Sequence, residues 1–242
     1  MNLKLGNYTK EMVQIFSIEG NIGSGKSTLI RCLKKINKDI IFVLEPVDEW
    51  ATITDLKGEN ILTKFYRNQS KYSFSFQMMA YISRLSKLKK VVAQNPNAII
   101  ITERSILTDK NVFAKMLYDD KHIEEVDYTI YLKWFDEFIE DVTQTGFIYI
   151  KSYPHICMQR VEKRNRSGEV IALSYLERCH QYHENWLAYE KNILLLDGNV
   201  EFKEDTEVLI QWNKKICEFI SLDHKKCSLD KLIDLWKYSS HC

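Results

Sequence analysis

Five short runs of apolar residues, rich in β-branched side chains, recur along the chain. Each run is nearly continuous in apolar character instead of alternating, which is typical of strands covered on both faces of a parallel sheet. The pattern therefore predicts five buried parallel strands. They are expected at residues 13–18, 40–44, 99–102, 147–150 and 193–196.

The segments between these runs carry apolar residues at helical spacing. In the longest segment these positions include Phe74, Met78 and Ile82, so one face of a helix would be apolar. Pro154 suits a first helical turn. Helices are predicted at 28–35, 72–92, 126–142, 154–164 and 174–189.

Alternating strands and helices predict one doubly wound, three-layer α/β domain with a five-stranded parallel sheet, and 242 residues suffice for it. Ligands of such folds bind outside the carboxyl ends of the strands. Four of the five strands end at or next to a residue that could bind a ligand or take part in a reaction. These strand ends carry Gly20, Glu45, Glu103 and Asp197, and we expect them to converge on one edge of the sheet.

The segment that follows the first strand fits the phosphate-loop pattern G-x-x-x-x-G-K-[ST] and precedes a helical pattern. Its glycines let backbone N–H groups surround a phosphate, Lys26 neutralises charge, and the Ser27 hydroxyl can ligate Mg²⁺. A nucleoside triphosphate is the expected ligand. The expected contacts are Gly20, Asn21, Ile22, Gly23, Ser24, Gly25, Lys26, Ser27 and Thr28.

Composition narrows the class of protein. A formal net charge of +1 provides no bulk field for nucleic acid or an anionic membrane, and no apolar run is long enough to span a bilayer. Six scattered cysteines without a C-x-x-C pair fit reduced thiols. Cys179 and His183 could share a ligand face, but no second pair completes a zinc site. We expect a soluble, cytoplasmic protein without a nucleic-acid or membrane partner.

Five motifs, in order, make the chain resemble the deoxynucleoside kinase family, and most closely its deoxycytidine and deoxyguanosine kinase branch. The resemblance covers residues 13 to about 205 and implies a P-loop kinase domain, taken as 1–222, followed by an extension at 223–242 of unknown role. A further amphipathic helix is expected at 228–237. The motifs are Ile18-Glu19-Gly20-Asn21-Ile22, Glu45-Pro46-Val47 with Trp50, Phe74-Ser75-Phe76-Gln77 and Glu103-Arg104-Ser105, together with the phosphate loop.

The resemblance implies transfer of the γ-phosphoryl group of ATP to the 5′-hydroxyl of a deoxynucleoside. Glu45 matches the general base, which the reaction needs because a neutral alcohol is a poor nucleophile. Glu103 resembles the carboxylate that ligates magnesium, and Arg104 resembles the arginine that holds the 5′-oxygen and the catalytic glutamate. From position alone, Glu45 could instead open a turn and Glu103 could pair with Arg104.

The residues that match the nucleoside pocket are Trp50, Tyr66, Phe76, Gln77, Arg84, Asp109 and Phe113. The Gln77 amide can pair bidentately with a base edge, cytosine or, flipped, thymine. Phe76 and Phe113 resemble the two faces that hold the base. In the family, an Arg84–Asp109 pair beside a small residue, here Ala80, goes with deoxycytidine and purine deoxynucleosides rather than thymidine. An ordinary interhelical salt bridge is the alternative for this pair.

The resemblance places a lid at about 160–173. Its arginines would contact the phosphates and stabilise charge in the transition state. Glu169 matches the glutamate that, with Tyr66, holds the 3′-hydroxyl. A missing lid carboxylate and Lys110 in place of the usual arginine depart from the family pattern. The expected lid cations are Arg160, Lys163, Arg164 and Arg166, and the donor-base loop carries Asp197 and Phe202.

The resemblance also implies a homodimer through helices that include 72–92 and 126–142. Three other functions stay open: a thymidine-accepting or broad-specificity kinase, a thymidylate-type monophosphate kinase, and a non-catalytic nucleotide-binding module. A monophosphate acceptor would be repelled by a carboxylate at Glu45, and the chain has no evident guanine-selecting N-K-x-D stretch. Base preference and the choice between ATP and UTP are not fixed by these residues.

Overall fold

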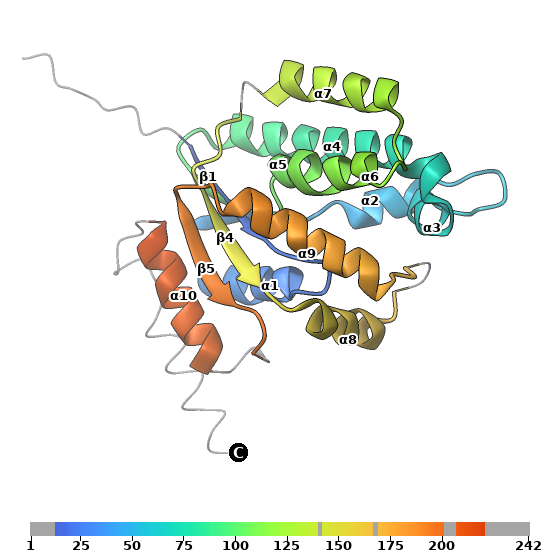
Figure 1. Ribbon diagram of the computed structural model, residues 1–242. Helices are drawn as coiled ribbons and strands as arrows, with labels where there is room; N and C mark the ends of the chain where they lie inside the picture. The colour runs from blue at the N-terminus through green and yellow to red at the C-terminus, as the bar shows by residue number, and fades with distance from the viewer. Residues whose placement is uncertain (1–12, 140–141, 167–168, 201–206, 221–242) are drawn as a thin grey trace, which may run out of the picture.

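The computed structural model describes residues 13–139, 142–166, 169–200 and 207–220. Five parallel strands form one sheet in the order β2-β3-β1-β4-β5 (Figure 1). This confirms the predicted doubly wound sheet, with β1 at its centre. The strands are β1 (Gln14–Glu19), β2 (Ile40–Val43), β3 (Ile99–Glu103), β4 (Gly146–Lys151) and β5 (Ile193–Asp197).

Helices cover the two faces of this sheet and give the three layers seen in Figure 1. One face carries α1 (Lys26–Ile36) and α10 (Glu207–Phe219). The other carries α4 (Gln69–Gln94), α7 (Glu125–Ile139) and α9 (Leu173–Leu187). The remaining helices are α2 (Val47–Thr52), α3 (Ile61–Arg67), α5 (Ile106–Thr108), the π-helix η1 (Asp109–Ala114), α6 (Lys115–Asp119) and α8 (Pro154–Arg164).

Alternating side chains of β1 pack into two separate cores. Phe16 and Ile18 face α1 and α10, whereas Ile15 faces the helices of the other side. All three side chains are almost completely buried. Both faces of the strand are therefore covered, which is the condition that its sequence predicted.

The outer strand β5 differs from this pattern. Leu195 in the middle of β5 is 56% exposed, so the prediction that every strand is covered on both faces is wrong for this strand. A sheet edge has a neighbouring strand on one side only, and here part of one face also lacks a covering helix. The apolar run of β5 alone did not distinguish an edge strand from a central one.

The predicted helices are confirmed with small shifts at their ends, and 154–164 matches α8. Predicted residues 140–141 and the expected helix at 228–237 lie outside the described residues. Helices α2, α3, α5, η1, α6 and α10 were not predicted. Both α2 and α3 span fewer than two helical turns, with six and seven residues, so their apolar spacing is too brief to indicate a helix.

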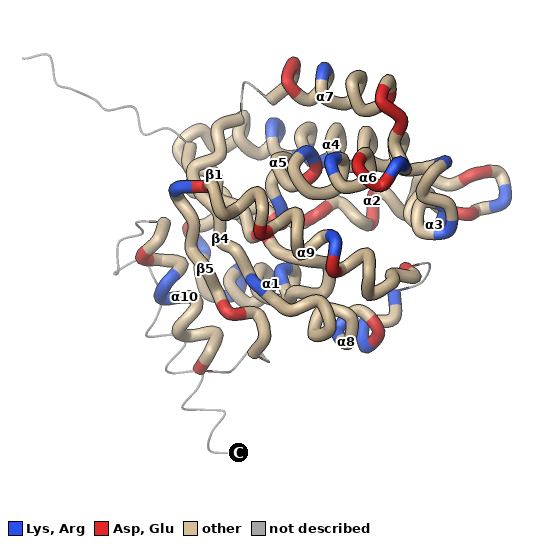
Figure 2. The backbone as a smooth tube through the Cα atoms, in the orientation of Figure 1, with Lys and Arg blue, Asp and Glu red and all other residues tan. Residues whose placement is uncertain are grey.

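Three further observations bear on the class of protein. No helix within the described ranges is long and apolar enough to cross a bilayer. Lysines, arginines and acidic residues are interspersed along the chain in Figure 2, in keeping with its small net charge. Cys157 and Cys179 are free and buried, as expected of reduced thiols, whereas Cys217 is disulfide-bonded and departs from that expectation.

Candidate active site

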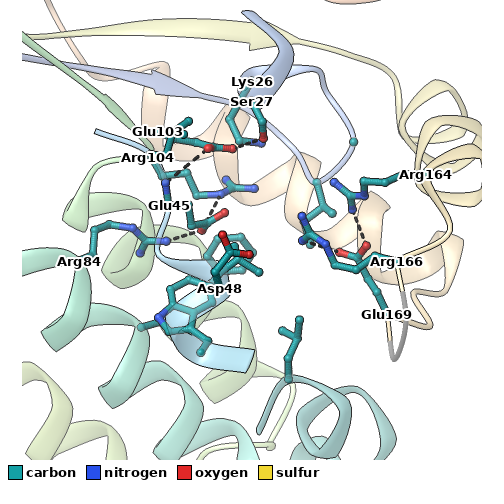
Figure 3. A pocket seen from close by; sticks show the side chains of 18 of the residues that line it. Lys26, Ser27, Glu45, Asp48, Arg84, Glu103, Arg104, Arg164, Arg166 and Glu169 are labelled. Carbon is teal, nitrogen blue, oxygen red and sulfur yellow. Dashed lines mark hydrogen bonds and ion pairs between the residues drawn. The ribbon is translucent and has the colours of Figure 1, made fainter. Parts of the chain in front are cut away.

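A cavity of about 760 Å³ opens beyond the carboxyl ends of β1, β2 and β3. Its walls come from the loop between β1 and α1, from α2, α3, α4 and η1, and from the end of α8 with the residues after it. Eight basic and five acidic side chains line it, so the cavity has a positive balance that suits an anionic ligand. Figure 3 shows ten of these residues pointing toward the same space.

The phosphate loop connects β1 to α1. Gly20, Gly23 and Gly25 have φ angles of 141°, 82° and 102°, a region that other residues rarely adopt. A Cβ atom on Gly20 would lie 2.6 Å from the Ile150 carbonyl oxygen, so this position also needs glycine for space. No side chain caps the first turn of α1, which leaves its N–H groups available to an anion.

Lys26 begins α1 and is 5% exposed. Its Nζ atom donates to the carbonyl oxygens of Gly20 and Asn21, at 3.1 and 2.7 Å. Burial is the largest cause that lowers the pKa of Lys26, and nearby Arg104 lowers it further, to about 7. A bound polyphosphate would supply the negative charge that this ammonium group lacks.

Ser27 and Glu103 meet at the bottom of the cavity. The Ser27 hydroxyl donates to Glu103 Oε1 at 2.5 Å, and the Glu45 backbone N–H donates to Glu103 Oε2 at 3.4 Å. Glu103 ends β3 and Ser27 lies in the first turn of α1, so two adjacent strands bring these oxygen atoms together. Hydroxyl and carboxylate oxygens are the ligands that Mg²⁺ prefers.

Glu45 follows β2 and lies between two arginines. Arg84 Nη2 donates to Glu45 Oε1 at 2.5 Å, and Arg104 Nε lies 3.7 Å from the same oxygen (Figure 3). Burial raises the pKa of Glu45, but the positive charges of Arg84, Arg104 and Lys26 outweigh burial and lower it overall. The carboxylate is therefore ionised near neutral pH and can accept a proton from a ligand.

Arg104 has a backbone φ of 62°, which is unusual for a residue with a side chain. Several contacts hold it there. Its backbone N–H donates to Ile18 O at 3.1 Å, its Nη1 atom donates to Gly20 O at 2.8 Å, and its guanidinium lies 4.9 Å from the centre of the Phe113 ring. A strained backbone that is fixed from several sides is typical of a functional position.

Glu19, the last residue of β1, fixes the chain just beyond Arg104. Its carboxylate is fully buried and accepts from the Ser17 hydroxyl at 2.7 Å, from the Ser105 N–H at 2.8 Å and from the Thr108 hydroxyl. This group ties the strand that leads into the phosphate loop to the turn that carries Arg104. The motif Ile18-Glu19-Gly20 contained Glu19, but sequence reasoning gave it no role.

The half of the cavity formed by α4 and η1 contains a buried ion pair. Arg84 on α4 donates to Asp109 at the start of η1, and both side chains are almost inaccessible. Burial lowers the pKa of Arg84, but Asp109 and Glu45 raise it more strongly. The π-helix places Asp109 and Phe113 so that both line the cavity.

Two buried polar atoms in this half have no partner in the described part of the chain. They are Gln77 Oε1 and Arg84 Nε. An unsatisfied buried polar atom costs about 1–3 kcal/mol, so these atoms indicate a place where a ligand supplies hydrogen bonds. Gln77 is a residue of α4 and is only 2% exposed.

Aromatic side chains form one wall of the cavity. Phe76 stacks on Phe65 with ring centres 4.5 Å apart and meets Trp50 edge-on at 5.7 Å. Phe65 therefore covers one face of Phe76. Burial, followed by the negative charge of Glu169, raises the pKa of the Tyr66 hydroxyl, so Tyr66 is a neutral hydrogen-bonding group beside that carboxylate.

The lid cations differ in their protein contacts. Arg164 donates to Glu169 at 2.5 Å, and Arg166 lies 3.9 Å from it. Arg160 instead binds the loop after β5, donating to Gly198 O at 2.8 Å and Val200 O at 3.0 Å. Lid residues 167–168 are outside the described ranges.

Most predicted site residues line this one cavity. Gly20, Asn21 and Ser24 are in the phosphate loop but do not line it, because the loop buries them. Asp197 ends β5 at the same sheet edge, two strands from β1, and binds the Asn199 N–H at 3.0 Å instead of reaching the cavity. The four strand ends therefore share one edge of the sheet as expected, but Asp197 does not line the cavity. Phe202 lies outside the described residues.

Sequence reasoning missed other lining residues. The cavity also includes Arg31, Asp48, Phe65 and Tyr175. Asp48 lies three residues after Glu45, and Phe65 directly precedes Tyr66, so proximity to recognised positions was the available signal. Arg31 continues the exposed face of α1 beyond Ser27 and Thr28.

A phosphate loop that faces an ionised carboxylate across one cavity defines a P-loop phosphotransferase. A deoxynucleoside kinase family model matches residues 16–221, so the chain belongs to the deoxynucleoside kinase family. Deoxycytidine kinase 1 of Xenopus laevis is 34% identical over 89% of this chain and 93% of that protein. Human deoxycytidine kinase is 33% identical over 86% and 92%, and the mitochondrial deoxyguanosine kinase of Xenopus laevis is 31% identical over 88% and 92%.

The buried state of Lys26 predicts proton uptake when ATP binds. At pH 8 the empty protein holds Lys26 mainly neutral, because its pKa is lowered to about 7, and phosphate charge would restore the proton. Since ATP itself is fully deprotonated at pH 8, calorimetric titrations in two buffers of different ionisation enthalpy should show uptake of a large fraction of one proton.

This uptake should diminish below pH 7, where Lys26 already carries its proton. Lys26→Met should abolish it, whereas Lys34→Met, at a solvent-exposed position of the same helix, should keep it. Equal uptake in wild type and Lys26→Met would show that another group takes the proton.

Proposed function

We propose that the enzyme transfers the γ-phosphoryl group of ATP to the 5′-hydroxyl of a deoxynucleoside in nucleoside salvage, with deoxycytidine, deoxyadenosine or deoxyguanosine preferred as acceptor. The observation that carries the proposal is the position of Glu45. Its carboxylate lies in the cavity, held by Arg84 and Arg104, across from the phosphate loop.

Glu45 takes the proton from the attacking hydroxyl in this proposal. Its lowered pKa keeps the carboxylate ionised, so it is ready to accept a hydrogen bond from the acceptor. A carboxylate with a low pKa is a weak base, and its contribution therefore comes from orientation as much as from proton affinity. Arg104, 3.7 Å from the same oxygen, is placed to hold the hydroxyl oxygen in line with the phosphorus.

The chain also supplies the charges that phosphoryl transfer needs. The N–H groups of the phosphate loop and Lys26 bind the β- and γ-phosphates in this proposal, while Arg164 and Arg166 stabilise the charge that spreads over the transferred group. Arg160 holds the loop after β5, which we propose as the donor-base loop together with Asp197 and Phe202.

We propose Ser27 and Glu103 as the residues that hold Mg²⁺. Their oxygen atoms are 2.5 Å apart and line the cavity beside Lys26, which fits a hard cation that keeps most of its ligands as water and phosphate oxygens. The ion would neutralise charge on the β- and γ-phosphates. No cluster of three or more acidic, histidine or cysteine ligands occurs within the described ranges, so an all-protein cage is not expected.

The acceptor is bound by the other half of the cavity in this proposal. Gln77 and the Arg84–Asp109 pair face the base, and the partnerless Gln77 Oε1 and Arg84 Nε support this assignment. Phe76 and Phe113 hold the base from its faces, with Trp50 beside them. The neutral Tyr66 hydroxyl and the nearby Glu169 carboxylate would bind the 3′-hydroxyl.

Glu45→Gln tests the base. The amide cannot accept the hydroxyl proton as a base, so kcat should fall by about 10² to 10⁴, while ATP binding stays close to that of the wild type. Steady-state kinetics with deoxycytidine and a separate ATP titration measure the two quantities. Near-normal turnover would remove Glu45 from this role.

Arg84→Met combined with Asp109→Ala tests base selection. Loss of the pair leaves an apolar space that suits the 5-methyl group of thymine, so the ratio of kcat/KM for thymidine to that for deoxycytidine should rise by about tenfold or more. Overall turnover should fall as well, because Arg84 also pairs with Glu45. An unaltered ratio would contradict the pair as the selector.

We further propose a homodimer through α4 and α7. The outward sides of these helices carry apolar side chains that are 38–70% exposed. They are Ile82, Val126, Ile130, Trp134 and Phe138. Trp134 and Phe138 stack with ring centres 5.6 Å apart, which gives a rigid apolar surface on the outermost helix of Figure 1.

Trp134→Glu should therefore shift the protein from twice the mass of one chain to the mass of a single chain in sedimentation equilibrium. Leu195→Glu, an equally drastic change at an exposed apolar position on β5, should leave the mass doubled. A wild-type protein with the mass of one chain at micromolar concentration would contradict the dimer.

Two further proposals concern the domain boundaries and the cellular compartment of the protein. We take 1–222 as the kinase domain and 223–242 as an extension. The cytoplasm stays our prediction for the compartment, and a tagged full-length protein imaged in cells would check it.

A further inference from the structure

Asp48 is a carboxylate that the proposed reaction does not use. It lies in the first turn of α2, three residues after Glu45, and it lines the active-site cavity. Figure 3 shows its side chain directed into the same space as Glu45 and the lid arginines. No role follows for it from the phosphate loop, the base pocket or the lid.

The other carboxylates that line the cavity all have a partner. Glu45 and Asp109 bind Arg84, Glu103 binds Ser27, and Glu169 binds Arg164. Within the described residues, by contrast, the Asp48 side chain makes no hydrogen bond or ion pair. An exposed acidic side chain without a partner thus lines a cavity whose other charges suit an anionic ligand.

An acidic residue in a first helical turn is favoured by the helix dipole, and Asp48 and the next residue, Glu49, both satisfy this preference from exposed positions. Asp48 differs from Glu49 because it also lines the cavity. Its effect on the ligands is therefore a separate matter from helix stability.

Substrate and product differ in charge at this place. The proposed acceptor is a neutral alcohol, while the product carries a phosphate with a charge of about −2 on the oxygen that Glu45 deprotonates. Figure 3 shows the Asp48 and Glu45 side chains in the same region of the cavity, so that phosphate would lie in the same part of the cavity as the Asp48 carboxylate. Like charges repel across a partly solvated cavity, and the neutral acceptor experiences no such repulsion.

We propose that Asp48 is a specificity residue that weakens binding of the nucleoside monophosphate. Its charge rejects a monophosphate as an acceptor and promotes release of the monophosphate product, at little cost in affinity for the neutral acceptor. This inference rests on the proposed function, because it assumes that the acceptor hydroxyl binds at Glu45. The discrimination comes from a repulsive group rather than from an added contact.

Asp48→Asn tests the proposal, since the amide keeps the shape of the side chain and removes its charge. The dissociation constants of deoxycytidine and deoxycytidine 5′-monophosphate are measured by titration calorimetry with no phosphate donor present. We expect the dissociation constant of the monophosphate to be about 5- to 30-fold lower for Asp48→Asn than for the wild type. The dissociation constant of deoxycytidine should change by less than about twofold.

Two matched variants make the result specific. Glu49→Gln removes the same charge from the adjacent exposed position and should leave both constants unchanged. Asp48→Glu keeps the charge and should restore weak monophosphate binding. Unfolding midpoints of all variants, measured in parallel, separate a loss of fold from a change in binding.

Several outcomes would overturn the inference. They are an unchanged monophosphate constant in Asp48→Asn, an equal change in Glu49→Gln, or an equal loss of affinity for deoxycytidine, which would make Asp48 an acceptor ligand. A separate assay of the wild-type protein, which measures turnover of the four deoxynucleosides with ATP, tests the proposed function itself. If none of them is phosphorylated, the proposed function fails, whatever the titrations show. If another deoxynucleoside is the one phosphorylated, that nucleoside and its monophosphate replace the deoxycytidine pair in the titrations.

Discussion

The guanidinium group of Arg84 is shared by two carboxylates, and the organisation of the active site depends on it. Arg84 Nη2 binds Glu45 and Nη1 binds Asp109, all three within a largely buried cluster. Each carboxylate would be costly to bury without this cation. The same side chain therefore lowers the pKa of the proposed base and fixes the residue proposed to select the acceptor base. Turnover and selection are consequently coupled, because a change at Arg84 disturbs both carboxylates.

The carbonyl oxygen of Gly20 is a second atom group that is shared by two partners. It accepts from Lys26 at 3.1 Å and from Arg104 at 2.8 Å, so one backbone oxygen holds two cations in place. Glu19, the preceding residue, fixes the chain beyond Arg104 through Ser105. These contacts keep the charged groups close to their working positions before any ligand is bound. Less reorganisation is then needed during the reaction, which is the main advantage of a preorganised site.

The sequence predicted the parts of the fold that depend on local pattern. Continuous apolar runs located the strands, and the phosphate-loop pattern located the glycine-rich connection between β1 and α1, because each pattern follows directly from burial or from backbone conformation. The exposure of Leu195 on β5 was not predictable, since an apolar run does not reveal how many neighbours a strand has. The helix α10 was also missed, although Leu209 and Trp212 show that it has a buried face.

The site was predictable mainly through the resemblance, which identified residue types and not their contacts. The Arg84–Asp109 pair was expected, but the bond from Arg84 to Glu45 was not, because it depends on how α4 crosses the end of β2. Asp48 was missed for a related reason. An acidic residue in a first helical turn has an ordinary explanation in the helix dipole, and only the shape of the cavity shows that this one faces the ligands.

Both ends of the cavity contain cations and carboxylates, but the partners of the carboxylates differ. Toward the phosphate loop and lid, Glu103 binds Ser27 and Glu169 binds Arg164. Toward the proposed acceptor, Glu45 is held by Arg84 and Arg104, whereas the Asp48 side chain has no partner among the described residues. The proposed acceptor is neutral until it receives the phosphoryl group, and a cavity that was positive throughout would also attract the phosphorylated product. Carboxylates on the acceptor side make the cavity favourable for the reactants and less favourable for the monophosphate that the reaction forms.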